Sequence, residues 1–137
     1  MRAVLDSNVI ISALLAPSGS PAIVLRAWLD GGYELIASPL LCAELERALG
    51  YSKIRSRISE AESRQFIELL GHQAEMVDDP DTPPPVQSSD PGDNYLIALA
   101  AATRSVILSG DHHLLDLAGR LPVYSPAAFL ELLAGEH

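Results

Sequence analysis

Four carboxylates occupy positions where a strand is expected to end or a helix to begin. These acids are Asp6, Glu44, Asp93 and Asp111. Two of them follow apolar runs of strand length, residues 2–5 and 106–108, and the other two lie near the starts of expected helices. Carboxylates that meet within a few ångströms repel one another unless protons or cations lie between them. Hard divalent cations such as Mg²⁺ and Mn²⁺ prefer these oxygen ligands, and a bound ion can activate water against a phosphodiester. The four acids therefore predict a metal-dependent hydrolytic site.

Each aspartate also has a purely structural explanation. Asp6 and Asp111 could cap the helices that follow them, and the charge of Asp93 could favour a helix start. Taken singly, capping explains each aspartate better than metal binding does. Glu44 is harder to explain in this way, because at about 100° per residue it falls at the margin of the apolar face of its helix. A carboxylate there needs a partner, whereas Glu46 falls on the outward face.

The apolar pattern alternates between strand and helix along the whole chain. Strands are expected at residues 2–5, 33–37, 74–77 and 106–108, with a weaker one at 122–124. Helices are expected at residues 8–15, 20–29, 38–49, 59–71, 92–103, 112–118 and 125–133. We expect a basic connection at residues 51–57 and a long proline-containing loop at 78–90. This alternation predicts an α/β fold with a parallel sheet of four to five strands, covered on both faces. Ligands of such sheets bind beyond the carboxyl ends of the strands, and all four acids fall at that edge.

Length and composition are those of a globular protein. With 137 residues, of which 48% are apolar, the chain fits a single domain spanning residues 1–137. Cys42 is the only cysteine, which excludes an intramolecular disulfide and is typical of a reducing cytoplasm. The first residues do not form a signal peptide, and the longest apolar run, Tyr95 to Ala102, is too short to cross a membrane. We therefore expect a cytoplasmic protein without a membrane partner.

The net charge argues against a nucleic-acid partner, but the distribution of the basic residues argues for one. A formal charge of −9 favours an acidic protein with no polyanionic ligand, although bound cations would cancel part of the excess. Five of the nine basic residues nevertheless lie within eighteen positions: Arg47, Lys53, Arg55, Arg57 and Arg64. This group is the candidate for phosphate contacts, and an ordinary solvated surface is its alternative explanation.

Four short motifs share the order and spacing of a known family. They are residues 4–10 (VLDSNVI), 38–45 (SPLLCAEL), 90–94 (DPGDN) and 108–111 (LSGD). With the closing helix that starts at Ser125-Pro126, they resemble PIN-domain proteins over nearly the whole chain, especially the VapC-like toxins of toxin–antitoxin pairs. The resemblance implies a three-layer α/β/α fold, a Mg²⁺ or Mn²⁺ site and endoribonuclease activity. It also suggests an antitoxin partner and a homodimer.

The resemblance assigns roles to individual residues. It carries metal-site roles onto Asp6, Glu44, Asp93 and Asp111. Supporting positions are expected at Ser7, Asn8, Asp90, Asn94 and Ser109. Related sequences often carry more acids in the third motif, where this chain has Gly92 and Asn94, so a second metal is expected to bind weakly. Metal-assisted hydrolysis by water predicts products with a 5′-phosphate and a 3′-hydroxyl.

Other function classes fit the sequence less well. A phospho-acceptor receiver domain needs a lysine near its last strands, and the only lysine is Lys53. A haloacid-dehalogenase-type phosphatase needs Asp-x-Asp after the first strand, but position 8 is Asn. His112 and His113 could touch a substrate, although a solvent-facing pair is the simpler expectation. A catalytically weak or inactive PIN fold that binds another protein stays open as the alternative function.

Overall fold

Five parallel strands form a single sheet in the computed structural model, which describes residues 1–135. The strands are β1 (Arg2–Leu5), β2 (Glu34–Ala37), β3 (Glu75–Met76), β4 (Val106–Leu108) and β5 (Val123–Tyr124). Their order is β3-β2-β1-β4-β5, and every neighbouring pair is parallel. The predicted α/β class and the parallel sheet are therefore confirmed. The strand order changes direction between β1 and β4, and such a switch point is where open α/β sheets bind ligands.

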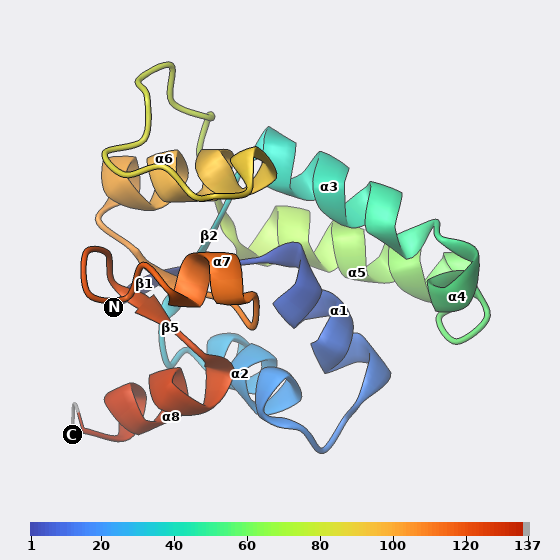
Figure 1. Cartoon of the computed structure of the whole chain (residues 1–137). Helices are drawn as coiled ribbons and strands as arrows, with labels where there is room; N and C mark the ends of the chain where they lie inside the picture. Colours follow the sequence, from blue (N-terminus) through green and yellow to red (C-terminus); the bar gives the residue numbers. More distant parts are fainter. Residues whose placement is uncertain (136–137) are drawn as a thin grey trace.

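Helices cover both faces of the sheet (Figure 1). They are α1 (Ser7–Leu15), α2 (Ser20–Leu29), α3 (Pro39–Leu49), α4 (Ser52–Arg55), α5 (Glu60–Gln73), α6 (Asn94–Thr103), α7 (His112–Leu115) and α8 (Pro126–Ala134), with a 3₁₀ turn at Pro91–Asp93. One core joins the sheet to α1, α2, α5 and α8, and the other joins it to α6 and α7. Helix α3 contributes to both cores. The expected three-layer arrangement is therefore present.

Side-chain alternation along the strands produces the two cores. In β1, Ala3 and Leu5 enter the core with α1 and α2, while Val4 enters the core with α6. All three are completely buried. A strand covered on both faces needs a continuous apolar run, which is why β1 lacks the polar–apolar alternation of a half-exposed strand. In the first core, Tyr33 meets Phe129 edge to face, with ring centroids 5.0 Å apart.

Side-chain caps set the helix starts that the sequence predicted. Asp6 caps α1, Ser38 caps α3 and Ser125 caps α8. Ser59 and Glu62 form a complete capping box at the start of α5. Asp111 caps α7 as Asp6 caps α1, so the aspartates that follow β1 and β4 are both helix caps. Capping and site formation therefore use the same residues rather than excluding each other.

Some boundaries differ from the sequence prediction. The connection at residues 51–57 contains the short helix α4, because the Tyr51 carbonyl accepts the amides of Ile54 and Arg55. The helix expected from residue 92 begins instead with a 3₁₀ turn, and α6 starts at Asn94. Helix α7 ends at Leu115, three residues earlier than expected, and the chain continues in turns. Within residues 1–135, no single helix has the length and apolar character of a membrane span. Helices α1 and α2 meet this criterion only when they are counted together, and they are bent by 100°.

Candidate metal centre

Three of the four predicted acids converge beyond the carboxyl ends of β1 and β4. Asp6, Asp93 and Asp111 each offer a carboxylate oxygen, and these oxygens all lie within 4.8 Å of one another. Asp6 follows β1 and Asp111 follows β4, and these two strands are neighbours in the sheet. Asp93 reaches the same place from the turn that begins α6. Residues separated by up to 105 positions are thus brought together by the parallel pairing of β1 with β4.

Ser109 fixes the positions of two of these acids. Its hydroxyl is fully buried and donates to the Asp6 carboxylate, with 2.9 Å between Oγ and Oδ2. The Ser109 Oγ also accepts a hydrogen bond from the Asp111 amide, at 2.9 Å. Asp6, which is only 5% exposed, also accepts the Asn8 amide at 3.4 Å. The hydroxyl of Ser109 therefore couples the first and last acids of the cluster directly.

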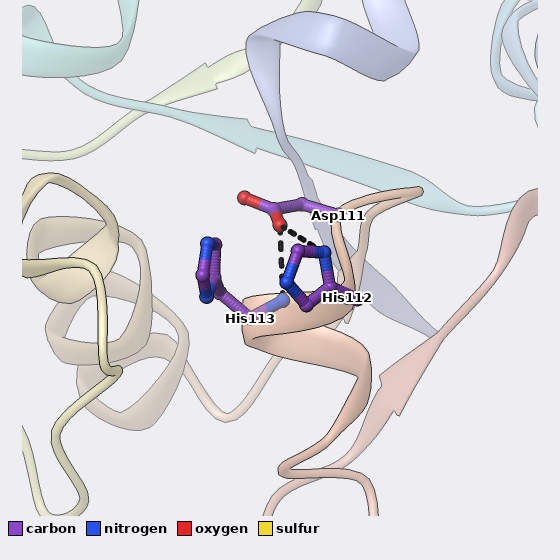
Figure 2. Close-up of side chains that lie close together, drawn as sticks. All are labelled: Asp111, His112 and His113. Atoms are coloured by element: carbon purple, nitrogen blue, oxygen red, sulfur yellow. Dashed lines mark hydrogen bonds and ion pairs between the residues drawn. The ribbon is translucent and has the colours of Figure 1, made fainter.

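Asp111 lies at the start of α7 beside a pair of histidines (Figure 2). Its Oδ1 accepts the His113 amide at 2.9 Å and lies 3.8 Å from Nδ1 of His112. The His112 side chain is exposed, as the sequence suggested. His113 is half-buried, and its Nδ1 lies 2.9 Å from the Ser89 hydroxyl. The pair is therefore not uniformly solvent-facing, because His113 is held against the segment that precedes Asp93.

The segment before α6 is tied to the cluster by Ser88, a residue that the sequence did not single out. The Ser88 hydroxyl accepts the Asp90 amide at 3.1 Å and lies 3.5 Å from Oδ2 of Asp93. Its amide donates to the Asn94 side chain at 2.9 Å. Ser88 is buried, and Asp90 in turn accepts the Gly92 amide. The only sequence signal for the contact between Ser88 and Asp90 was their spacing, Ser-x-Asp, which is a common local turn pattern.

Glu44 lines the same pocket but lies outside the group of three aspartates. It forms an ion pair with Arg47, one turn further along α3. Both residues line a pocket of about 270 Å³ that also contains the three aspartates. Tyr95, which the sequence analysis did not propose, lines it as well. The structure thus places three predicted acids together, with the fourth in the same pocket, paired with an arginine.

The three clustered carboxylates are electrostatically unfavourable when all are ionised. Burial raises the pKa of Asp93 to about 6, with further contributions from the charges of Asp6 and Asp111. The pKa of Asp6 is raised chiefly by burial, although the Ser109 hydrogen bond opposes this shift. Burial and the nearby acids also raise the pKa of Tyr95 above its usual range.

The donor set fits a hard divalent cation. Within residues 1–135, no lysine or arginine pairs with Asp6, Asp93 or Asp111. Carboxylates that repel one another and lack a basic partner are the ligands that Mg²⁺ and Mn²⁺ prefer. Asp6, Asp93 and Asp111 would hold such an ion, with Glu44 available in the same pocket.

The raised pKa of Asp93 predicts how stability depends on pH in the metal-free protein. The folded state keeps the Asp93 proton up to about pH 6, whereas the unfolded chain loses it near the ordinary value of 3.8. The contribution of Asp93 to the free energy of unfolding is therefore present below about pH 4 and is lost as the pH rises to about 6. Urea denaturation in a chelator should show Asp93→Asn gaining on the parent as the pH rises through this window. If Asp93→Asn and the parent differed in free energy of unfolding by the same amount at about pH 4 and at about pH 6, the raised pKa of Asp93 would be contradicted.

The other residues predicted to support the acids differ in their exposure and in whether they line the carboxylate pocket. Ser7 is buried and Asn8 is exposed, and both line the carboxylate pocket. Asp90 lines it as well, whereas the Asn94 side chain holds the Ser88 amide.

The predicted basic group is spread over α3, α4, α5 and the loop between the last two. Arg57 donates to the Leu15 carbonyl at 3.3 Å, and Arg64 pairs with Glu60 at 3.0 Å. Lys53 is exposed on α4. Arg55 is half-buried, and its Nη1 has no hydrogen-bond partner in the part of the chain that the structure describes. Only Arg47 lines the carboxylate pocket.

Comparison with known proteins identifies the family. A search of curated proteins gave no significant match. The fold is similar to a chain in the structure of VapBC2 from Rickettsia felis bound to a DNA fragment from their promoter, with a TM-score of 0.64, 13% identity, and coverage of 91% of this chain and 98% of that one. It is also similar to VapBC-1 from nontypeable Haemophilus influenzae, with a TM-score of 0.59, 17% identity, and coverage of 93% and 99%. A family model described as PIN domain matches residues 2–113, so this chain belongs to the PIN domain family.

Proposed function

We propose that this protein is a metal-dependent endoribonuclease that hydrolyses RNA phosphodiesters to 5′-phosphate and 3′-hydroxyl products. The observation that carries the proposal is the convergence of Asp6, Asp93 and Asp111 within 4.8 Å at the switch point of the sheet. Membership of the PIN domain family and the absence of a basic partner for these acids within residues 1–135 support the same function.

The chain's own residues determine what the site can do. When bound, Mg²⁺ or Mn²⁺ supplies an activated water and neutralises charge on the phosphate. The Ser109 hydroxyl holds the Asp6 carboxylate and the Asp111 backbone amide, and the His113 amide holds the Asp111 carboxylate. Both carboxylates therefore need little reorganisation to bind a cation. The Asp93 carboxylate has one longer contact, with 3.5 Å between the Ser88 Oγ and Asp93 Oδ2.

Arg47 is the basic residue best placed to meet a phosphate at the site. It lines the carboxylate pocket and is exposed apart from its pairing with Glu44. An arginine presents several N–H donors in a fixed plane, so it can contact a phosphate oxygen while remaining near Glu44. It would orient the substrate strand across the three aspartates.

The rest of the basic group is proposed to contact the RNA backbone further from the cut. Replacing both Arg55 and Arg57 with alanine should weaken RNA binding and reduce the slope of log affinity against log salt by about 0.7–0.9 per lost phosphate contact. Fluorescence anisotropy at several KCl concentrations measures both quantities. Mn²⁺ affinity should stay parental, because neither arginine lines the carboxylate pocket.

A matched control for this change is the double variant Arg26→Ala, Arg120→Ala. It removes the same two charges from exposed positions outside the basic group. If this control lowers the salt slope as much as the Arg55, Arg57 variant does, net charge rather than position governs binding, and the proposed RNA path is wrong.

The structural neighbours support a partner of the antitoxin kind. Both are VapBC structures, and one is bound to a DNA fragment from their promoter. We propose that this chain binds a cognate antitoxin and forms a homodimer. Exposed apolar side chains on α2, namely Ile23 and Leu29, provide surface for such contacts.

A metal-dependent digest tests the proposed activity. Structured RNA incubated with the protein and Mn²⁺ should give fragments with 5′-phosphate and 3′-hydroxyl ends, and a chelator should abolish their formation. Fragments with 2′,3′-cyclic phosphate ends, or cleavage that persists in the chelator, would contradict metal-assisted hydrolysis at this site.

A further inference from the structure

A second pocket adjoins the carboxylate pocket on the side of β5. Its volume is about 550 Å³, compared with about 270 Å³ for the carboxylate pocket. Asn8 and Asp111 line both pockets, so the two share a wall. A strand whose phosphate lies at the three aspartates would therefore have an adjacent group at the mouth of the larger pocket.

The pocket lies between the first turns of three helices. Its lining comes from the starts of α1, α2 and α8 and from the loop after β4. Helix α2 packs against both α1 and α8, and Figure 1 shows these three helices on the same side of the sheet. This position, beyond the ends of β1, β4 and β5, is the same switch-point edge that carries the aspartates.

Two of the three helix starts at this pocket, those of α1 and α8, are capped and do not favour an anion. Free amides at a helix start attract phosphate, but here Asp6 caps α1 and Ser125 caps α8. Pro21 and Pro126 stand in the first turns of α2 and α8 and have no N–H to donate. No lysine or arginine within residues 1–135 lines the pocket, and its charged lining residue, Asp111, is negative. A phosphate is therefore disfavoured.

The wall chemistry instead suits a flat neutral ring. Val9, Pro21 and Pro126 supply apolar surface, and the hydroxyls of Ser12 and Ser20 can donate or accept hydrogen bonds at its edge. Pockets of about 300–1,000 Å³ with mostly apolar walls and few polar groups are typical small-molecule sites. A base extruded into a protein pocket is recognised by hydrogen bonds to its edge and by contact of its faces with aromatic or apolar side chains.

We propose that this pocket binds the nucleobase next to the scissile phosphate and gives the nuclease its sequence preference. The inference rests on the proposed function, because the base is brought there by a substrate strand lying on the three aspartates. Ser12 and Ser20 would read the edge of the base, and the two prolines would contact its face.

Filling the pocket tests the proposal. Ala127, at the second position of α8, is exposed and lines the pocket, so Ala127→Phe should occupy it without disturbing the core. Ser12→Phe, from the exposed position on α1, provides a second and independent filling variant. Ala102→Phe is the matched control, because Ala102 is exposed on α6 and does not line the pocket.

Binding of single nucleotides provides the readout that does not depend on activity. We expect the four nucleoside 5′-monophosphates to shift the amide NMR signals of Ser20 and Ala127 with unequal affinities, in the presence of Mg²⁺. Ribose 5-phosphate, which lacks a base, should not shift them. Both filling variants should lose the response at Ser20, the reporter that they share with the parent. If ribose 5-phosphate shifts these signals as strongly as the nucleotides do, the pocket binds phosphate and the proposal is overturned.

Cleavage of RNA of known sequence provides the second readout. Both filling variants should lose about five-fold to about a hundred-fold in kcat/KM and spread their cuts over more sequences, while Mn²⁺ affinity stays parental. Parental rates and an unchanged cutting pattern in both would refute the base pocket while leaving the nuclease intact. A parent that cuts no RNA would refute the proposed function, and the nucleotide titration would then still decide whether the pocket binds bases.

Discussion

Asp93→Asn is expected to reduce metal-dependent RNA cleavage by more than about a hundred-fold, since losing even a supporting residue of a metal site commonly costs 10–100-fold. The substitution keeps the size of the side chain but removes one of the three carboxylates that lie within 4.8 Å of one another. The remaining acids would bind the cation less tightly and would place it less accurately. Initial rates on a fixed RNA at saturating Mn²⁺ measure the loss.

Two stability measurements should accompany the loss of activity. Without metal, Asp93→Asn should be at least as stable as the parent at neutral pH, because one charge has left a repulsive group. With Mn²⁺, the parent should gain stability through binding linkage and the variant should gain much less. If Asp93 only supported the start of α6, asparagine would change the free energy of unfolding by a few tenths of a kcal/mol at most, with or without metal.

Glu46→Gln is the matched control for Asp93→Asn. It also removes one negative charge, but Glu46 is exposed and does not line the carboxylate pocket. It should keep parental activity and parental Mn²⁺ stabilisation. An equal loss in both variants would show that net charge, and not the geometry of the aspartates, sets the activity.

Ser109→Ala is expected to lower both stability and activity. The change removes a fully buried hydroxyl that donates to Asp6 and accepts the Asp111 amide. Leaving a buried donor and acceptor without partners should cost about 1–3 kcal/mol in the free energy of unfolding. Because two acids lose their common anchor, Mn²⁺ affinity or activity should fall by about 10–100-fold.

Ser105→Ala separates the two effects of losing a buried serine. Ser105 lies just before β4, at the opposite end of that strand, and its buried hydroxyl lies 2.6 Å from that of Thr103. We expect a loss of stability of similar size, measured by urea denaturation, with parental Mn²⁺ affinity. If Ser109→Ala binds Mn²⁺ as the parent does, Ser109 has no role in positioning the acids.

The sequence could predict the positions of residues that follow a strand or begin a helix. Asp6 and Asp111 follow continuous apolar runs, and two neighbouring parallel strands must end at the same edge of a sheet. Their proximity therefore follows from the fold class once the alternation of strands and helices is read correctly. Asp93 is placed almost as well, because it lies at the start of the helix that precedes β4, and such a helix begins at the carboxyl edge of the sheet.

The pairing of Glu44 could not be predicted in the same way. Its position at the margin of the apolar face of α3 is as expected, and it lines the carboxylate pocket. The ion pair with Arg47 depends on the rotamers of two long side chains on one helix, which the sequence pattern does not fix. The pattern therefore gives the helix face on which Glu44 lies but not its distance from the aspartates.

The contacts of Ser88 depend on loop conformation and tertiary packing. The region of residues 78–90 has no helix or strand, so no periodicity indicates which of its side chains turn inward. Ser88 is buried, and its amide and hydroxyl both make hydrogen bonds at the start of α6, which only the folded loop reveals. Helix α4 was missed for a related reason, since a single helical turn of four residues is too short to show an apolar period.

A Mn²⁺ titration of the parent protein by calorimetry, alongside Asp93→Asn and Glu46→Gln, would test whether the three aspartates form a metal centre. We expect saturable binding to the parent and to Glu46→Gln, and binding at least about ten-fold weaker to Asp93→Asn. Metal-dependent thermal stabilisation should follow the same order. A parent that binds no Mn²⁺ at neutral pH, or an Asp93→Asn variant that binds it as tightly as the parent, would contradict the metal centre and favour a PIN fold that serves only to bind another protein.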